Sequence, residues 1–225
     1  MLNLETSYIH DIAPETDGSH SLLLMLPGAK NTPQQLVDFG FIAALRKRQL
    51  AIDVLALNAH VDFYLDQRDI SHLLHQTLAS VRSYGYRRIW ILGVSLGATG
   101  AMICATQYSS EIEGIFLLAP FLGTRGLIAE VQAAGGLSHW LPGEISRNDH
   151  ERALLQQIRC RLDTAEGFPP IHLGYGSEDR FRGASIMLSA HLPPQRVAVA
   201  AGGHDWQTWQ QLWHSLLDTE PFGPS

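Results

Sequence analysis

The sequence is poor in the residues that mark several classes of protein. It contains 2 cysteines among 225 residues, Cys104 and Cys160, and so lacks the disulfide framework of a small secreted domain. Low cysteine content is typical of a protein in a reducing compartment. Residues 1–6 include no basic segment followed by an apolar stretch, so the sequence predicts no secretory signal peptide. We therefore expect a cytoplasmic protein.

Positive charge and long apolar runs are also scarce. There are 16 Lys and Arg against 22 Asp and Glu, a net charge of −6, and the basic run 46–48 is typical of a helix C-terminus. This balance argues against a nucleic-acid partner. The longest nearly apolar stretch, residues 89–105, contains glycines, Ser95 and Thr99. It is too short and too polar for a membrane span, and it predicts a buried strand followed by a buried helix.

Strand-like and helix-like segments alternate along the chain. Short runs that are apolar on both faces predict the strands of a buried parallel sheet, at 21–26, 52–57, 88–92, 115–119, 171–175 and 196–200. Segments with helical periodicity lie at 32–47, 69–84, 96–108, 182–190 and 205–217. The alternation predicts one α/β domain over residues 1–225, with a doubly wound, mostly parallel sheet flanked by helices. Residues 5–10 could add a strand.

One segment interrupts this alternation. Residues 121–168 separate two predicted strands and are longer than a simple crossover requires. Helical patterns occur within them at 124–134 and 149–161. The segment is interpreted as a lid or cap over the site, or as ordinary helices packed at the edge of the sheet.

A short motif supplies a candidate nucleophile. Residues 93–97 read Gly-Val-Ser-Leu-Gly, directly after a predicted strand and before a predicted helix. In that context Gly-x-Ser-x-Gly is a nucleophile elbow, in which Ser95 occupies a strained turn and the glycines allow strand and helix to approach closely. The alternative is a serine that only shapes a glycine-rich turn.

A serine nucleophile needs a base and a group that orients the base. Loops at the carboxyl ends of parallel strands meet at one edge of the sheet. The loop after 171–175 offers Asp179, with Glu178 as the alternative acid, and the loop after 196–200 offers His204. We predict a triad of Ser95, Asp179 and His204, against the alternatives that Asp179 only forms a turn and that His204 only begins a helix.

Two main-chain N–H groups should stabilise the oxyanion that forms during attack. The elbow geometry assigns one to Leu96. Ala29 is the candidate for the other, with Gly28 keeping that loop close to the serine, unless residues 27–28 are an ordinary Pro-Gly turn.

Further residues are candidates for lining the pocket: Gly28, His60, Asp62, Trp140 and Trp206. His72 and His75 share a helix face without a third ligand at metal spacing, so we predict no metal site. The predicted chemistry requires no cofactor.

These residues resemble the α/β-hydrolase superfamily, specifically its small serine esterases and lipases. The resemblance rests on the loop 27–29, the motif at 93–97, Asp179 and the loop 203–206, in the order nucleophile, acid, histidine. Many members carry His-Gly where this chain has Pro27-Gly28, which affects loop rigidity more than the main-chain donors. The resemblance implies hydrolysis of a small-molecule carboxylic ester through an acyl-enzyme.

The same triad would also serve a thioesterase, an amidase, a C–C or lactone hydrolase, or an acyltransferase. A member of another class, a non-catalytic domain of this fold that binds a ligand or scaffolds a partner, stays open as an alternative. The sequence leaves the acyl and alcohol specificity and the oligomeric state undetermined.

Overall fold

A seven-stranded sheet forms the centre of the molecule in the computed structural model, which describes residues 4–14, 20–65, 67–162, 167–219 and 221–222. The strand order is β1-β3-β2-β4-β5-β6-β7. β1 pairs antiparallel with β3, and every other neighbouring pair is parallel. The predicted α/β class with a mostly parallel sheet is therefore confirmed. The strands are β1 (Tyr8–Asp11), β2 (Ser21–Leu26), β3 (Asp53–Leu57), β4 (Arg88–Val94), β5 (Gly114–Leu118), β6 (Ile171–Gly176) and β7 (Val197–Ala200).

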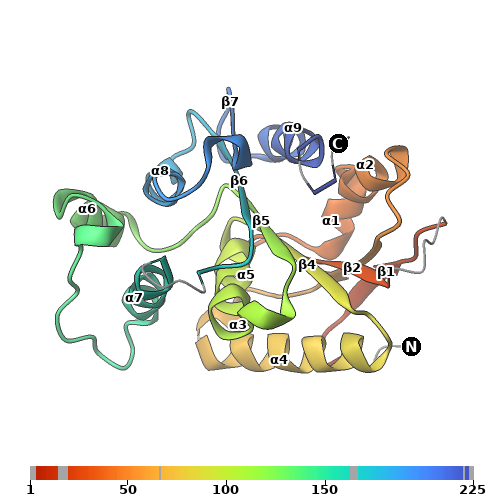
Figure 1. Cartoon of the computed structure of the whole chain (residues 1–225), viewed down its shortest axis with the longest axis horizontal. Coiled ribbons are helices and arrows are strands. Elements are labelled where there is room, and N and C mark those ends of the chain that lie inside the picture. The colour runs from red at the N-terminus through yellow and green to blue at the C-terminus, as the bar shows by residue number, and fades with distance from the viewer. Residues whose placement is uncertain (1–3, 15–19, 66, 163–166, 220, 223–225) are drawn as a thin grey trace.

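Helices cover both faces of this sheet (Figure 1). They are α1 (Pro33–Asp38), α2 (Phe41–Lys47), α3 (Asp62–Leu65), α4 (Gln67–Ser83), α5 (Leu96–Gln107), α6 (Arg125–Ala133), α7 (His150–Leu162), α8 (Arg182–Ser189) and α9 (Trp206–Leu217). Successive residues of a strand point to opposite faces. Leu22 and Leu24 accordingly join one core with α4 and α5, while Leu23 and Met25 join a second core with α2 and α9. None of the helices in the described ranges is long and apolar enough to cross a bilayer.

The single helix predicted over 32–47 is two helices. α1 begins at a capping box in which Thr32 accepts from the Gln35 amide and Gln35 bonds back to the Thr32 amide. Gly40 then adopts a left-handed conformation, with φ of 76°, between α1 and α2. Because this conformation cannot continue a right-handed helix, the chain changes direction there.

The long segment after β5 carries α6 and α7, which extend to one side of the sheet (Figure 1). Its apolar residues Val131, Trp140 and Leu154 are buried in the same core as α4 and α5. Leu141, by contrast, is 75% exposed. Within the predicted excursion 121–168, residues 163–166 lie outside the described part of the chain. Its role as a lid or cap stays a prediction.

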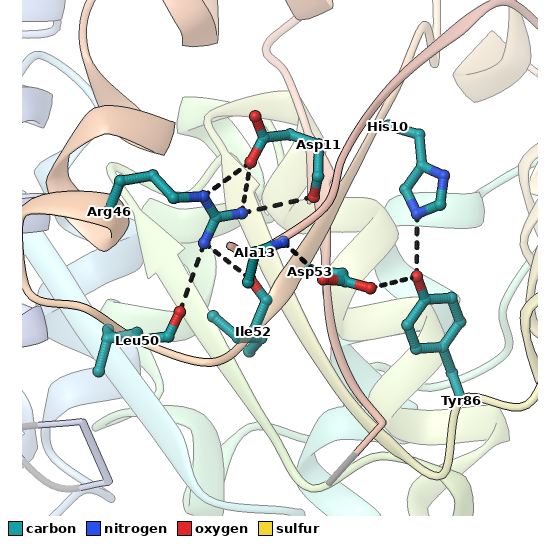
Figure 2. A network of polar contacts seen from close by, with 8 residues as sticks. All are labelled: His10, Asp11, Ala13, Arg46, Leu50, Ile52, Asp53 and Tyr86. Atoms are coloured by element: carbon teal, nitrogen blue, oxygen red, sulfur yellow. Dashed lines mark hydrogen bonds and ion pairs between the residues drawn. The ribbon is translucent and has the colours of Figure 1, made fainter. Parts of the chain in front are cut away.

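A polar network holds the edge strand β1 in place (Figure 2). Arg46 donates to the Asp11 carboxylate and to main-chain carbonyls between α2 and β3. Tyr86 donates its hydroxyl proton to Asp53 over 2.6 Å, and His10 Nε2 lies 2.9 Å from the same hydroxyl. Asp53 begins β3 and Tyr86 precedes β4, so this network lies at the amino ends of the strands, opposite to the end of β4 that leads into α5.

Candidate active site

Ser95 occupies the turn between β4 and α5 in a backbone conformation that is unusual for a residue with a side chain. Its φ is 52° and its ψ is −114°. The Ser95 amide donates to Leu118 O over 2.9 Å, and Ser95 O accepts from the Phe121 amide over 3.0 Å. Such a conformation costs about 1–3 kcal/mol and persists only where neighbouring structure fixes it. Here the end of β5 provides that restraint.

The two glycines of the motif allow α5 to pack directly on the sheet. A Cβ atom at Gly97 would lie 2.0 Å from Leu26 O, and one at Gly93 would lie 2.5 Å from the Cα atom of Ala98. Neither position has room for a side chain. The N-terminus of α5 is therefore held against the end of β2, next to Ser95.

Three side chains far apart in the sequence form one hydrogen-bonded path at this edge. His204 Nε2 lies 2.9 Å from Ser95 Oγ, and His204 Nδ1 lies 2.7 Å from Asp179 Oδ2. A carboxylate can only accept, so Nδ1 carries the proton and Nε2 is left to accept from the serine hydroxyl. The Asp179 side chain is 1% exposed and the His204 side chain 11%.

The environment of Asp179 distinguishes it from the neighbouring acids. Its second oxygen, Oδ1, accepts from the Phe181 amide over 2.7 Å, so both oxygens of this buried carboxylate are bonded. Glu178, the alternative acid, is exposed. Asp205 caps α9 and accepts from the Thr208 amide over 2.9 Å, a bond that lowers the pKa of Asp205.

Two aromatic rings that are not among the predicted site residues hold the imidazole. Phe181 and Trp209 both pack edge-on against His204, with ring centroids 4.9 Å and 5.0 Å away. Phe181 is two residues beyond Asp179, and Trp209 is one helical turn into α9. Their closeness in sequence to Asp179 and His204 is the signal that could have identified them as site residues.

A cleft of about 420 Å³ opens over the serine and the imidazole. Ala29 and Leu96, the candidate oxyanion donors, both border it. Leu96 is the first residue of α5, where a helix amide has no partner within the helix. A Cβ atom at Gly28 would lie 3.3 Å from Ser95 Cβ, so the predicted loop does approach the serine closely.

A smaller apolar pocket of about 70 Å³ adjoins the cleft, and Leu96 and Phe121 border both. We call it the inner pocket. Its walls include Ile70 of α4, Ile103 of α5 and Leu154 of α7. A substrate bound at Ser95 therefore has an apolar recess beside it.

The structure corrects the predicted positions of three pocket residues. His60 and Asp62 bond to each other over 3.1 Å with side chains 58% and 75% exposed, and they border neither cavity. Trp206 stacks on Phe39, with ring centroids 4.6 Å apart. As the first residue of α9 it faces the junction between α1 and α2, and Trp209 borders the cleft instead.

Trp140 also lies away from the predicted site. It is 1% exposed and donates its indole proton to Glu130 over 2.8 Å. The guanidinium carbon of Arg152 in α7 lies 5.6 Å from the centroid of its ring, so Trp140 joins α6 to α7. No group of three His, Cys, Asp or Glu residues within the described ranges is placed to hold a metal ion.

No family model matches the sequence, and no curated protein matches it by sequence. Solved structures do share its fold. An S-formylglutathione hydrolase from Staphylococcus aureus superposes with a TM-score of 0.61 at 12% identity, over 95% of this chain and 96% of that one. Est1E from Butyrivibrio proteoclasticus, bound to ferulic acid, superposes with a TM-score of 0.60 at 12% identity over 96% of each chain. A monoacylglycerol lipase from Paleococcus ferrophilus superposes with a TM-score of 0.59 at 13% identity, over 95% of this chain and 100% of that one. The chain therefore has the α/β-hydrolase fold.

Proposed function

We propose that the protein is a serine hydrolase that cleaves a carboxylic ester of a small substrate through an acyl-enzyme. The observation that carries this proposal is the continuous path from Ser95 Oγ through His204 to Asp179, with contacts of 2.9 Å and 2.7 Å. The strained conformation of Ser95 adds support, because strain of this kind gathers at functional sites.

Acylation begins with attack of Ser95 Oγ on the ester carbonyl carbon. His204 Nε2 takes the serine proton, and Asp179 stabilises the resulting imidazolium. The tetrahedral intermediate then collapses, the bond from carbon to the alcohol oxygen breaks, and His204 returns its proton to the leaving alcohol.

Deacylation repeats these steps with water. Water attacks the acyl carbon and gives a proton to His204, the bond to Ser95 breaks, and His204 returns the proton to Ser95 Oγ. The acid is released and the enzyme is restored. In both halves the amides of Leu96 and Ala29 donate to the oxyanion.

The two cavities indicate how the substrate lies. The leaving group must reach His204 to be protonated, so it occupies the part of the cleft bordered by Phe181 and Trp209. The acyl group then points past Leu96 into the inner pocket, whose apolar walls favour a short apolar chain.

The solved structures with this fold agree with acyl chemistry. Their names include an S-formylglutathione hydrolase and a monoacylglycerol lipase. Both reactions begin with attack on an acyl carbon. Because the fold alone hosts several reactions, the bond cleaved must be tested with a panel of esters, thioesters and amides.

Reaction with a fluorophosphonate probe, together with turnover of p-nitrophenyl acetate, tests the proposal. We expect the probe to add to Ser95, and Ser95→Ala to lose labelling and about three or more powers of ten in kcat. Ser83→Ala is the matched control, since Ser83 is exposed on α4. It should match the wild type. A folded Ser95→Ala variant that still turns over the ester would disprove the assignment, and an unreactive Ser95 would favour a non-catalytic binding domain.

A further inference from the structure

Three positively charged side chains lie at the cleft or in the hollow next to it, in a chain whose net charge is −6. Lys30 and Arg180 border the cleft itself. Arg180 also borders a second hollow of about 180 Å³, which Phe181 and Arg125 line as well. The three cations come from three separate segments: the loop after β2, the loop after β6 and the start of α6.

The two arginines converge on one aromatic ring. The guanidinium carbon of Arg180 lies 4.9 Å from the centroid of Phe181, and that of Arg125 lies 5.6 Å from it. The ring attracts each cation, whereas the two like charges repel each other. A site that gathers like charges in this way would be stabilised by an anion.

Within the described part of the chain, no carboxylate forms an ion pair with Lys30, Arg125 or Arg180. Arg46 and Arg152, by contrast, pair with Asp11 and Glu130. Other carboxylates of this region have different partners or positions. Asp179 is bonded to His204, Glu151 accepts from the Thr124 amide, and Glu178 borders none of the cavities described above.

The arginines lie on the side of the cleft proposed to hold the leaving group. Phe181 lies against His204, which protonates the leaving group, and both arginines lie over Phe181. The inner pocket, on the acyl side, has neither arginine in its wall. Their charge therefore acts on the alcohol part of the ester.

We propose that the substrate is an ester whose leaving group carries a negatively charged carboxylate or phosphate, bound by Arg125 and Arg180 and attracted by Lys30. This inference rests on the proposed function and adds the substrate class. It commits to a small anionic molecule, because the hollow beside Phe181 is small and the arginines stand within reach of the leaving group.

Two aryl acetates of matched shape test it, 4-acetoxybenzoate and 4-acetoxybenzamide. They share the acyl group and differ in charge on the leaving group. The measured quantity is the ratio of their kcat/KM values, anionic over neutral. We expect Arg180→Gln and Arg125→Gln each to lower this ratio by about threefold to fivefold, the range of a partly exposed ion pair, and the double variant to lower it further.

Arg88→Gln provides the matched control. Arg88 is exposed at the amino end of β4, the end opposite to Ser95, so this variant makes the same change of net charge away from the cleft. Both kcat/KM values should stay at the wild-type level. Arg180→Lys keeps the charge and should preserve most of the ratio. A third ester, 4-acetoxyphenyl phosphate, distinguishes a preference for phosphate from one for carboxylate.

Salt gives an independent measurement. Raising the ionic strength to about 1 M shortens the Debye length to about 3 Å. It should lower the ratio for the wild type and have little effect on the ratio for the double variant. A ratio that is the same in the wild type, the double variant and Arg88→Gln would overturn the inference while leaving ester hydrolysis intact. A wild type that cleaves no ester and does not react with fluorophosphonate would overturn the proposed function, and this inference with it.

Discussion

At the residue scale, the proposed chemistry depends on which nitrogen of His204 carries the proton. Asp179 sets this, because its Oδ2 accepts from Nδ1 while its Oδ1 is occupied by the Phe181 amide. The carboxylate therefore cannot rotate freely. It holds the imidazole with Nε2 directed at Ser95 Oγ.

Asp179→Asn keeps the shape of this side chain and removes its charge. An amide can donate to Nδ1, which would place the imidazole proton on Nε2 and remove the base. We expect kcat for p-nitrophenyl acetate to fall by about 10³–10⁴ while the protein stays folded.

Glu178→Gln is the matched control for this change. Glu178 is exposed beside Asp179 and was the alternative acid, so the same loss of charge there should leave kcat unchanged. Hydrolysis of p-nitrophenyl acetate measures kcat for both variants, and circular dichroism checks that both are folded. If Glu178→Gln is the inactive one, the acid has been assigned to the wrong residue.

At the element scale, helices from distant parts of the chain form the inner pocket, which is the proposed acyl side of the site. Leu154 and Leu155 are neighbours in α7, and both are buried. Leu154 borders the inner pocket, whereas Leu155 packs in the core outside it. Truncating each leucine in turn therefore distinguishes the effect of a larger pocket from the effect of a less stable helix.

Leu154→Ala should shift the preferred acyl chain to longer esters. Hexanoate has two more methylenes than butyrate, and each buried methylene contributes about 0.8 kcal/mol, so kcat/KM for p-nitrophenyl hexanoate relative to butyrate should rise by up to about 15-fold. Leu154→Ala and Leu155→Ala should each lower the free energy of unfolding by about 2–5 kcal/mol. Leu155→Ala should not shift the preferred chain length. Leu154→Val provides a milder enlargement if the alanine variant folds poorly. An equal chain-length profile for the Leu154 and Leu155 variants would mean that the acyl group binds elsewhere.

The elements that were predictable from sequence share a physical reason. Strands buried on both faces are continuous apolar runs, and the segment 21–26 is indeed β2. Residues directly after such strands must meet at one edge, which is why Ser95, Asp179 and His204 could be chosen from a chain with 11 histidines.

Side-chain direction within helices and loops was not predictable in the same way. Trp206 and Trp209 differ by one turn of α9, and packing against Phe39 decides that Trp206 turns away from the cleft. His60 follows β3 as a catalytic residue would, yet it bonds to Asp62 at the surface. Such choices depend on neighbours that are distant in sequence.

At the scale of the whole molecule, the sheet buries a second histidine that the proposed chemistry does not use. His172 lies on β6, 2% exposed and stacked on Phe116 with ring centroids 4.8 Å apart. Its Nδ1 atom is buried without a hydrogen-bond partner among the described residues. Burial, with a smaller effect of Arg196, lowers the pKa of His172 to about 4.

This histidine should make the fold sensitive to mild acid. The unfolded chain takes up the proton near pH 6.5, but the folded chain does so only near pH 4, so the unfolded state binds more protons between these values. Stability contributed by neutral His172 is therefore complete above pH 6.5 and is lost as the pH falls towards 4, by about 2–3 kcal/mol. Urea unfolding at several pH values should show this slope in the wild type. His172→Phe, which keeps an aromatic ring beside Phe116, should have a correspondingly flatter profile. Equal slopes for the two proteins would mean that His172 takes up its proton in the folded state as readily as in the unfolded chain, and that the acid sensitivity has its origin elsewhere in the molecule.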